Sequence, residues 1–155
     1  MNKLRYYITL IIIADIWFWL DFATKYWAEN QALLPWGNPQ GWFYLSQVTY
    51  NSGIAFGLPV GRWVQITATV LIIGFLLYMG HDWLKKTQKW FLQAVIFGVV
   101  IGGALGNFWE RVSQGYVVDF IVLKPFPNFN LADVGITVGL LALICLGWTI
   151  EKKGK

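Results

Sequence analysis

Two aspartates, Asp119 and Asp133, are the residues of this chain whose type and spacing most clearly indicate chemistry. Asp119 lies in the apolar run VVDFIV, and Asp133 follows in FNLAD, at the start of another apolar segment. An ionisable group next to a hydrophobic environment is costly to keep, which makes it a candidate for function. Two carboxyls brought together by a short connection suit an aspartyl hydrolase, in which one activates water and the other donates a proton. Because neighbouring carboxyls resist ionising together, such a pair shares one proton.

The residues alone leave a second interpretation of Asp133 open. Asn130 is predicted to cap a helix that begins after it, with Asp133 in the first turn. An acid at that position is stabilised by the helix dipole without any further role. Asp119, placed among apolar neighbours, is harder to explain in this way. The types and local positions of these residues therefore do not decide whether the two aspartates act as a pair.

The elements that must position these acids are membrane helices. The chain of 155 residues is 57% hydrophobic and 13% charged, with a mean hydropathy of +0.52. Three charge-free stretches approach the ~20 residues that cross a bilayer, and an equally apolar stretch near the N-terminus carries a few charges. We therefore predict an all-α membrane protein forming one domain over residues 1–155. The expected spans are residues 6–27, 63–80, 90–110 and 132–150.

The distribution of basic residues predicts the orientation of these spans. The net charge is +4, and most of the twelve basic residues fall at the two termini and in the connection between the second and third spans. Cytoplasmic loops carry an excess of lysine and arginine. Both termini are therefore expected in the cytoplasm, and Asp119 and Asp133 on the opposite side. The excess of basic residues is therefore explained by the orientation in the membrane and does not indicate a nucleic-acid partner.

The first span contains three charged residues within the apolar stretch. Asp21 and Lys25 are four residues apart, on one helical face and in the favourable order for an ion pair. They are either an interfacial pair or an anchor beneath a polar site, and the sequence leaves both interpretations open. Asp15 lies ~9 Å deeper along the helix, on a different face. Its role is left open.

The segment of residues 28–61 is the long extramembrane connection. Its aromatic and β-branched run at 42–50 predicts a strand within a small extracytoplasmic β-sheet between the first two helices. Asn51 and Gly53 then indicate a tight turn. Residues 116–123 are interpreted as a short extended or loosely helical piece. In the third span, glycines recur every four residues, a spacing that lets membrane helices approach closely.

The sequence offers few residues for catalysis or metal binding by histidine and cysteine. His81, the single histidine, is expected on the cytoplasmic side, far from the two aspartates. Cys145 is the single cysteine and lies inside the fourth span, so neither a disulfide nor a zinc framework is indicated. We expect neither a metal nor an organic cofactor.

Five short motifs in order resemble bacterial lipoprotein signal peptidase (signal peptidase II). They are LDFATK, NSGIAF, GGALGNFWER, VVDF and FNLAD, and together with the spans between them they cover most of the chain. The resemblance implies an intramembrane aspartyl endopeptidase of the bacterial inner membrane. Such an enzyme removes the signal peptide from a prolipoprotein, before a cysteine that carries diacylglycerol. The expected partners are this substrate and membrane lipids, and the expected state is a monomer.

The resemblance also assigns roles to individual residues. Asp119 and Asp133 match the catalytic pair. The substrate-binding residues that it implies are Asn51, Gly53, Asn107, Arg111 and Asn130, and the supporting residues are Asp21, Lys25 and Glu110. In the family a short helix lies across the site between the two aspartates. Here that connection is short and holds Pro125 and Pro127, which leaves open whether residues 120–129 cover the site.

A non-enzymatic function is the competing interpretation. A four-helix membrane protein could carry protons or ions on Asp15, Asp21 and Asp133. A relay of that kind needs acids at successive depths through the bilayer, and Asp15 is the deep one. The other acids gather at the outer edge, where water is accessible. The sequence therefore favours the peptidase.

Overall fold

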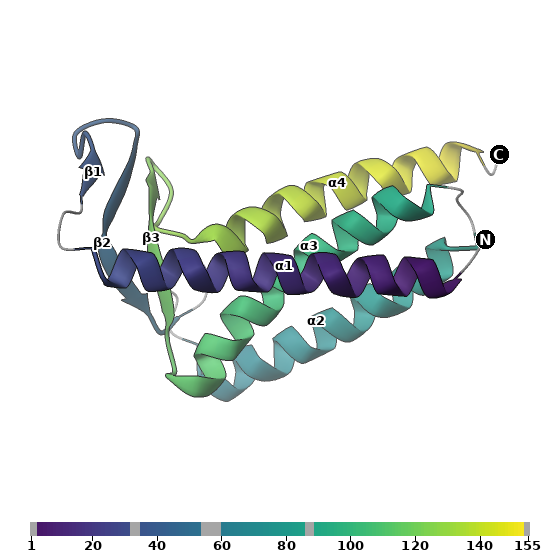
Figure 1. Cartoon of the computed structure of the whole chain (residues 1–155), viewed down its shortest axis with the longest axis horizontal. Helices are drawn as coiled ribbons and strands as arrows, with labels where there is room; N and C mark the ends of the chain where they lie inside the picture. Colours follow the sequence, from purple (N-terminus) through teal and green to yellow (C-terminus); the bar gives the residue numbers. More distant parts are fainter. Residues whose placement is uncertain (1–2, 32–34, 54–59, 86–88, 154–155) are drawn as a thin grey trace.

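The computed structural model describes residues 3–31, 35–53, 60–85 and 89–153, which form four long helices and a small sheet at one end (Figure 1). All four helices are long and apolar enough to cross a membrane. The four predicted membrane-length helices and the all-α membrane class are confirmed; the bounds of the spans and the single domain stay predictions. The helices are α1 (Lys3–Glu29), α2 (Arg62–Trp83), α3 (Trp90–Ser113) and α4 (Leu131–Lys153).

Helix α3 forms the centre of the bundle. It packs against α1, α4 and α2, and it is the most buried of the four spans. Its apolar side chains, among them Phe97 and Val100, join Leu10 of α1 and Leu143 of α4 in one core. The faces of α1, α2 and α4 that turn away from α3 expose large apolar side chains, as expected for helices in contact with lipid.

Small residues set how closely the helices approach. A Cβ atom added at Gly98 would lie 2.9 Å from the Leu10 carbonyl oxygen of α1, and one at Gly103 would lie 2.7 Å from the Ala132 carbonyl oxygen of α4. A Cβ at Gly106 would lie 2.6 Å from a carboxylate oxygen of Asp21. Larger residues would push the helices apart. The predicted close packing along α3 is confirmed.

The sheet is antiparallel, with strand order β1 (Trp36–Gly37), β2 (Phe43–Asn51) and β3 (Val117–Leu123). The expected strand at 42–50 is confirmed as β2. Residues 116–123 are extended rather than helical, and they supply the third strand. That pairing was not predicted, because β3 comes from the connection between α3 and α4. In the register of β2 and β3, Asp119 lies opposite Thr49.

The connection from β3 to α4 folds back on the sheet. The backbone N–H groups of Phe120 and Ile121 both donate to the Phe129 carbonyl, at 3.1 and 2.9 Å. Residues 124–130 form turns and an isolated bridge, and residues 120–130 contain no helix. The covering helix that the resemblance implied is therefore absent from this connection. Residues 126–129 instead form part of the wall of a cavity.

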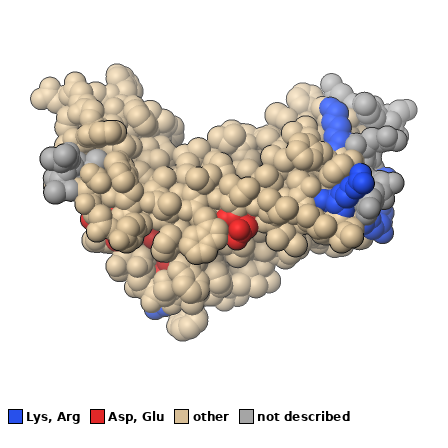
Figure 2. Space-filling view, viewed as in Figure 1, with Lys and Arg blue, Asp and Glu red and all other residues tan. Residues whose placement is uncertain are grey.

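The two ends of the bundle differ in charge. Both chain termini lie at the end away from the sheet (Figure 1), and lysine and arginine side chains gather at that end in Figure 2. Among them, Lys3, Arg5 and Lys85 are exposed. The cluster of acids and amides at Asp119 and Asp133 lies at the opposite end, where the sheet meets α3 and α4.

Candidate active site

A cavity of about 460 Å³ lies where β3 and the end of β2 meet α3 and α4. Its polar wall comes from two aspartates, three asparagines, an arginine and a threonine, and its remaining wall is apolar. The residues that line it include Asn51, Asn107, Arg111, Asp119, Leu123, Phe126, Asn128, Asp133, Val134 and Val138. The predicted pair of aspartates therefore faces one shared space.

Asp119 is placed by strand β3 and is buried, with 3% of its surface exposed. Asn51 Nδ2 donates to Asp119 Oδ2 at 3.0 Å, and Asn130 Nδ2 donates to Asp119 Oδ1 at 2.7 Å. Burial, aided by the nearby Asp133, raises the pKa of Asp119 from 3.8 to about 6, although the two amide donors and Lys25 oppose the shift. Asp119 is thus a carboxyl that holds its proton more strongly than an exposed aspartate does.

Asp133 is placed by the first turn of α4. Its backbone N–H donates to Asn130 Oδ1 at 3.0 Å, and the Asn130 N–H donates to Asp133 Oδ2 at 3.3 Å. These reciprocal bonds form a capping box, so the predicted N-cap is confirmed. Asn107 Nδ2 donates to the other carboxyl oxygen, Oδ1, at 2.8 Å. Both carboxyl oxygens of Asp133 thus accept hydrogen bonds, one from the backbone at the N-terminus of α4 and one from the side chain of Asn107 on α3.

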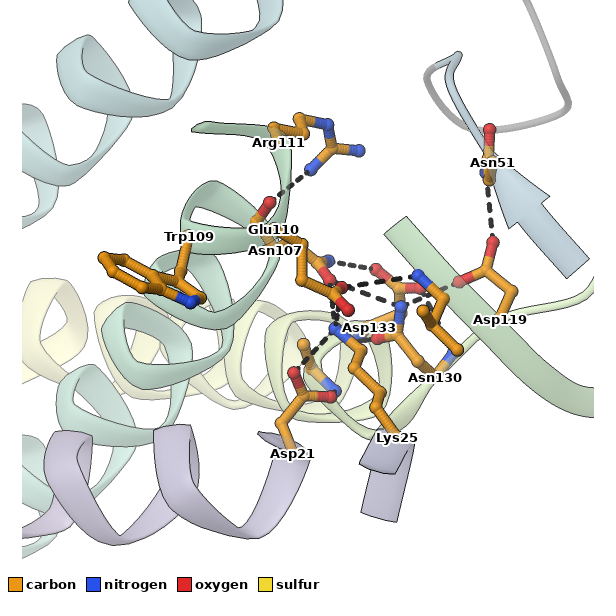
Figure 3. Close-up of polar contacts among 12 residues, drawn as sticks. Asp21, Lys25, Asn51, Asn107, Trp109, Glu110, Arg111, Asp119, Asn130 and Asp133 are labelled. Carbon is orange, nitrogen blue, oxygen red and sulfur yellow. Dashed lines mark hydrogen bonds and ion pairs between the residues drawn. The ribbon is translucent and has the colours of Figure 1, made fainter. Parts of the chain in front are cut away.

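Two asparagines connect the acids (Figure 3). Besides its bonds to Asp119 and Asp133, Asn130 donates through Nδ2 to Asn107 Oδ1 at 3.2 Å. Asn130 is fully buried and Asn107 nearly so. Buried amides that use several donors and acceptors hold their neighbours in one geometry. The two aspartates are therefore fixed relative to each other by α3 and by the start of α4.

A buried cluster of charged side chains lies beneath the pair of Asp119 and Asp133, called the dyad from here on. Lys25 Nζ contacts Asp21 Oδ2 and Glu110 Oε2, each at 2.7 Å, and donates to Asn107 Oδ1 at 2.9 Å. Asp21 Oδ1 also accepts the Ala132 backbone N–H at 2.8 Å. The predicted pair of Asp21 and Lys25 is confirmed, and it anchors α1 beneath the polar site. Removing one partner of a buried pair commonly costs 3–5 kcal/mol, so this cluster fixes α1, α3 and α4 together.

The other predicted residues reach the cavity to different extents. Asn51 and Arg111 line it, together with Asn107. Gly53 and Asn130 lie behind the lining: the Gly53 N–H donates to Asn51 Oδ1 at 2.9 Å, which forms the expected tight turn. Asp15 is exposed on α1, away from the cavity. His81 accepts or donates a 2.6 Å hydrogen bond with Tyr7 at the opposite end of the bundle.

Sequence reasoning missed two polar residues, Asn128, which lines the cavity, and Gln65, which lies behind the lining and contacts Arg111. The signal for Gln65 was a glutamine at the start of an otherwise apolar span. The apolar wall formed by Leu123 and Phe126 was also missed, because it depends on how the connection after β3 folds. Within the described residues, no group of three or more His, Cys, Asp or Glu side chains is arranged to hold a metal ion.

The fold and the site define a multi-pass membrane protein with an acid-lined cavity at one end of a four-helix bundle. Its sequence matches the family described as signal peptidase (SPase) II over residues 13–149. The lipoprotein signal peptidase of Halothermothrix orenii is 42% identical over 72% of this chain and 74% of its own length. That of Hydrogenovibrio crunogenus is 37% identical over 93% and 88%.

A solved structure, described as a bacterial membrane enzyme determined by the in meso method, superposes with a TM-score of 0.78. The sequence identity is 28%, and the match covers 95% of this chain and 92% of that one. The chain therefore belongs to the signal peptidase II family, which makes it a protease.

Proposed function

We propose that this protein is an aspartyl endopeptidase that removes signal peptides from prolipoproteins, before a diacylglyceryl-modified cysteine. The observation that carries the proposal is that Asp119 and Asp133 line one cavity at the end of the membrane-spanning bundle. The relatives' names as lipoprotein signal peptidases support the substrate.

The contacts of the two carboxyls support a division of labour between them. We assign the proton that the pair shares to Asp119, because burial raises the pKa of this carboxyl to about 6, above its ordinary value. Asp133, whose two carboxyl oxygens accept hydrogen bonds from Asn107 Nδ2 and the Asn130 N–H, is assigned the role of the general base. Asp133 takes a proton from water as the water attacks the scissile carbonyl, and Asp119 polarises that carbonyl. The proton is then delivered to the leaving amine, and the dyad returns to its first state.

The cavity's two kinds of wall suit the two parts of such a substrate. Asn51, Asn107 and Arg111 offer donors and acceptors to the peptide backbone near the scissile bond. Val134, Val138 and Phe126 offer an apolar surface that suits the acyl chains, and Phe126 and Val138 are exposed. Gly53 and Asn130 act on the substrate through Asn51 and through the dyad. Since one chain contributes the whole cavity, we propose that the enzyme acts as a monomer.

The placement of the acids supports hydrolysis over the alternative of a proton or ion carrier. Asp21, Glu110, Asp119 and Asp133 converge at one end of the bundle, joined by Lys25 and the two asparagines. Asp15 is the acid near the middle of a span, and it is exposed on α1 rather than directed into the bundle. A relay through the protein would instead need acids inside it at successive depths.

The function is tested by incubating purified protein with a synthetic prolipoprotein peptide whose cysteine carries diacylglycerol. We expect cleavage on the N-terminal side of that cysteine, identified by mass spectrometry, with a rate linear in enzyme concentration. The same peptide without the acyl chains should be cleaved far more slowly, because the apolar wall is then unfilled. No cleavage of the modified peptide would refute the proposed function.

We further propose that the protein lies in the bacterial cytoplasmic membrane with both termini in the cytoplasm and the active site at the outer face. The exposed basic residues at the end away from the sheet support this orientation. In a Cys145→Ser background, Lys85→Cys should be labelled by an impermeant reagent only in permeabilised cells. Ser113→Cys should be labelled in intact spheroplasts. Labelling of both residues from the same side would contradict the four-span orientation.

A further inference from the structure

Gln65 is a buried glutamine in the first turn of α2. The side chain is 6% exposed, although the only other buried residues of the helix are Leu76 and Gly80. Burying an amide costs free energy unless it is hydrogen-bonded. The position of Gln65 is therefore explained by its hydrogen-bond partners.

The Gln65 amide makes three hydrogen bonds in different directions. Its Oε1 accepts from Arg111 Nε at 2.6 Å. Its Nε2 donates to the Val60 carbonyl at 2.6 Å and to the Ser52 carbonyl at 3.0 Å. An amide nitrogen has two hydrogens, so these contacts use both donors. The side chain is held in one orientation and joins α2 to α3 and to the chain that follows β2.

Both of these connections lead to groups that line the cavity. The guanidinium of Arg111 is planar, so a bond at Nε and a second from Nη1 to the Asn107 carbonyl, at 3.4 Å, orient the whole group. Figure 3 shows Arg111 on the side of the dyad opposite Asp21 and Lys25. Ser52 directly follows Asn51, which donates to Asp119.

We propose that Gln65 is a positioning residue for substrate binding, which holds Arg111 and the turn at Asn51 toward the peptide of the substrate. This inference rests on the proposed function. Gln65 is not among the lining residues of the cavity, so it acts through its two neighbours rather than on the substrate. Asn107 and Asn130 hold the two aspartates independently of Gln65, which reaches Asp119 only through Asn51, so the loss of Gln65 affects binding more than the chemical step.

Substitution of Gln65 tests this role through steady-state kinetics with the diacylglyceryl peptide. Gln65→Leu is expected to raise KM about tenfold and to leave kcat within about twofold. Gln65→Glu keeps an acceptor for Arg111 Nε but loses both donors to the Ser52 and Val60 carbonyls, so it should recover only the part of the lost affinity that depends on Arg111. In an Arg111→Ala background, Gln65→Leu should add much less than in the wild type, because the group it orients is gone.

Gln93→Leu is the matched control. Gln93 is also a fully buried glutamine, and its Nε2 donates to the Gly80 carbonyl at 2.7 Å, near the opposite end of the bundle. This variant should lose thermal stability without a change in KM. The inference is overturned by an unchanged KM in Gln65→Leu, by equal effects with and without Arg111, or by the same KM change in Gln93→Leu.

A measurement without substrate separates this inference from the proposed function. In protein labelled with ¹⁵N-arginine, the Nε–H of Arg111 should exchange slowly with solvent in the wild type and in Gln65→Glu, and faster in Gln65→Leu. Equal exchange in the wild type and Gln65→Leu would refute the positioning role, whatever the substrate is. A wild type that shows the slow exchange but cleaves no modified peptide would refute the proposed function alone.

Discussion

Asp119→Asn and Asp133→Asn are each expected to lower cleavage by about a hundred- to ten-thousandfold, the range that general acid–base catalysis contributes. Asparagine keeps the shape of aspartate and can make most of its hydrogen bonds. It cannot accept the proton of the attacking water or deliver one to the leaving amine, so either change stops the cycle. Initial rates with the diacylglyceryl peptide measure this effect.

The difference in stability between Asp119→Asn and the wild type should depend on pH in a defined direction. The pKa of Asp119 is about 6 in the folded protein against 3.8 ordinarily, so folding favours its protonated form. The contribution of the protonated Asp119 carboxyl to the free energy of unfolding is fully present below pH 4 and is lost as the pH rises to 6. Above pH 6 the free energy of unfolding of the wild type is lower by about 3 kcal/mol for this reason. An asparagine at position 119 does not ionise and avoids this loss.

The hydrogen bonds of Asp119 offset part of that gain. Asn51 and Asn130 each direct an NH₂ group at one of its oxygens, and an asparagine at 119 would present an NH₂ group to one of them. That conflict costs about 1–3 kcal/mol. We therefore expect Asp119→Asn to match the wild type in stability near pH 7 and to be less stable near pH 4. Thermal unfolding at both pH values checks the sign.

Asp133→Asn should lose a little stability, since the charge at the start of α4 contributes about 0.3–1 kcal/mol. Asp15→Asn is the control, because Asp15 is exposed on α1 and does not line the cavity; it should keep full activity. Substantial turnover by Asp133→Asn, with an unchanged pH profile, would mean that Asp133 only caps its helix and that the paired carboxyls have been misidentified.

The four helices, and the contacts between residues a few positions apart in the chain, were predictable from the sequence. Hydrophobic length located the four helices, and spacing along a helix paired Asp21 with Lys25. The cap formed by Asn130 and Asp133 followed from the local signals of a helix start. These predictions succeed because each depends on a few neighbouring residues and on general costs of burying polar groups in a membrane.

The contacts between distant segments were not predictable from composition or periodicity. Lys25 bridges to Glu110, and Asn51 reaches Asp119, only because α1 packs on α3 and β2 pairs with β3. The strand character of residues 117–123 depends on a partner strand supplied by another loop. Gln65 was overlooked for the same reason: nothing in its own span indicates that Arg111 lies beside it.

Arg111→Ala is expected to lower kcat/KM by about a hundredfold, whereas Lys124→Ala should stay within about twofold of the wild type. Arg111 lines the cavity beside both aspartates, and a hydrogen bond from a charged group contributes about 1.5–3 kcal/mol. Lys124 Nζ donates to the Pro39 carbonyl at 3.0 Å and lies over the Tyr44 ring, outside the cavity lining. It stabilises the connection after β3 without facing the site.

Arg62→Ala is the matched control for the loss of an arginine at this end of the bundle. Arg62 Nη2 donates to the Val112 carbonyl, and the group lies over the Trp63 ring rather than in the cavity. All three variants remove one positive charge from the same end, so a general electrostatic effect would lower their kcat/KM alike. A loss confined to Arg111→Ala, and only partly recovered by Arg111→Lys because lysine lacks the Nε donor to Gln65, is the result that a directed substrate contact predicts. Comparable losses in Lys124→Ala would show instead that the connection after β3 grips the substrate.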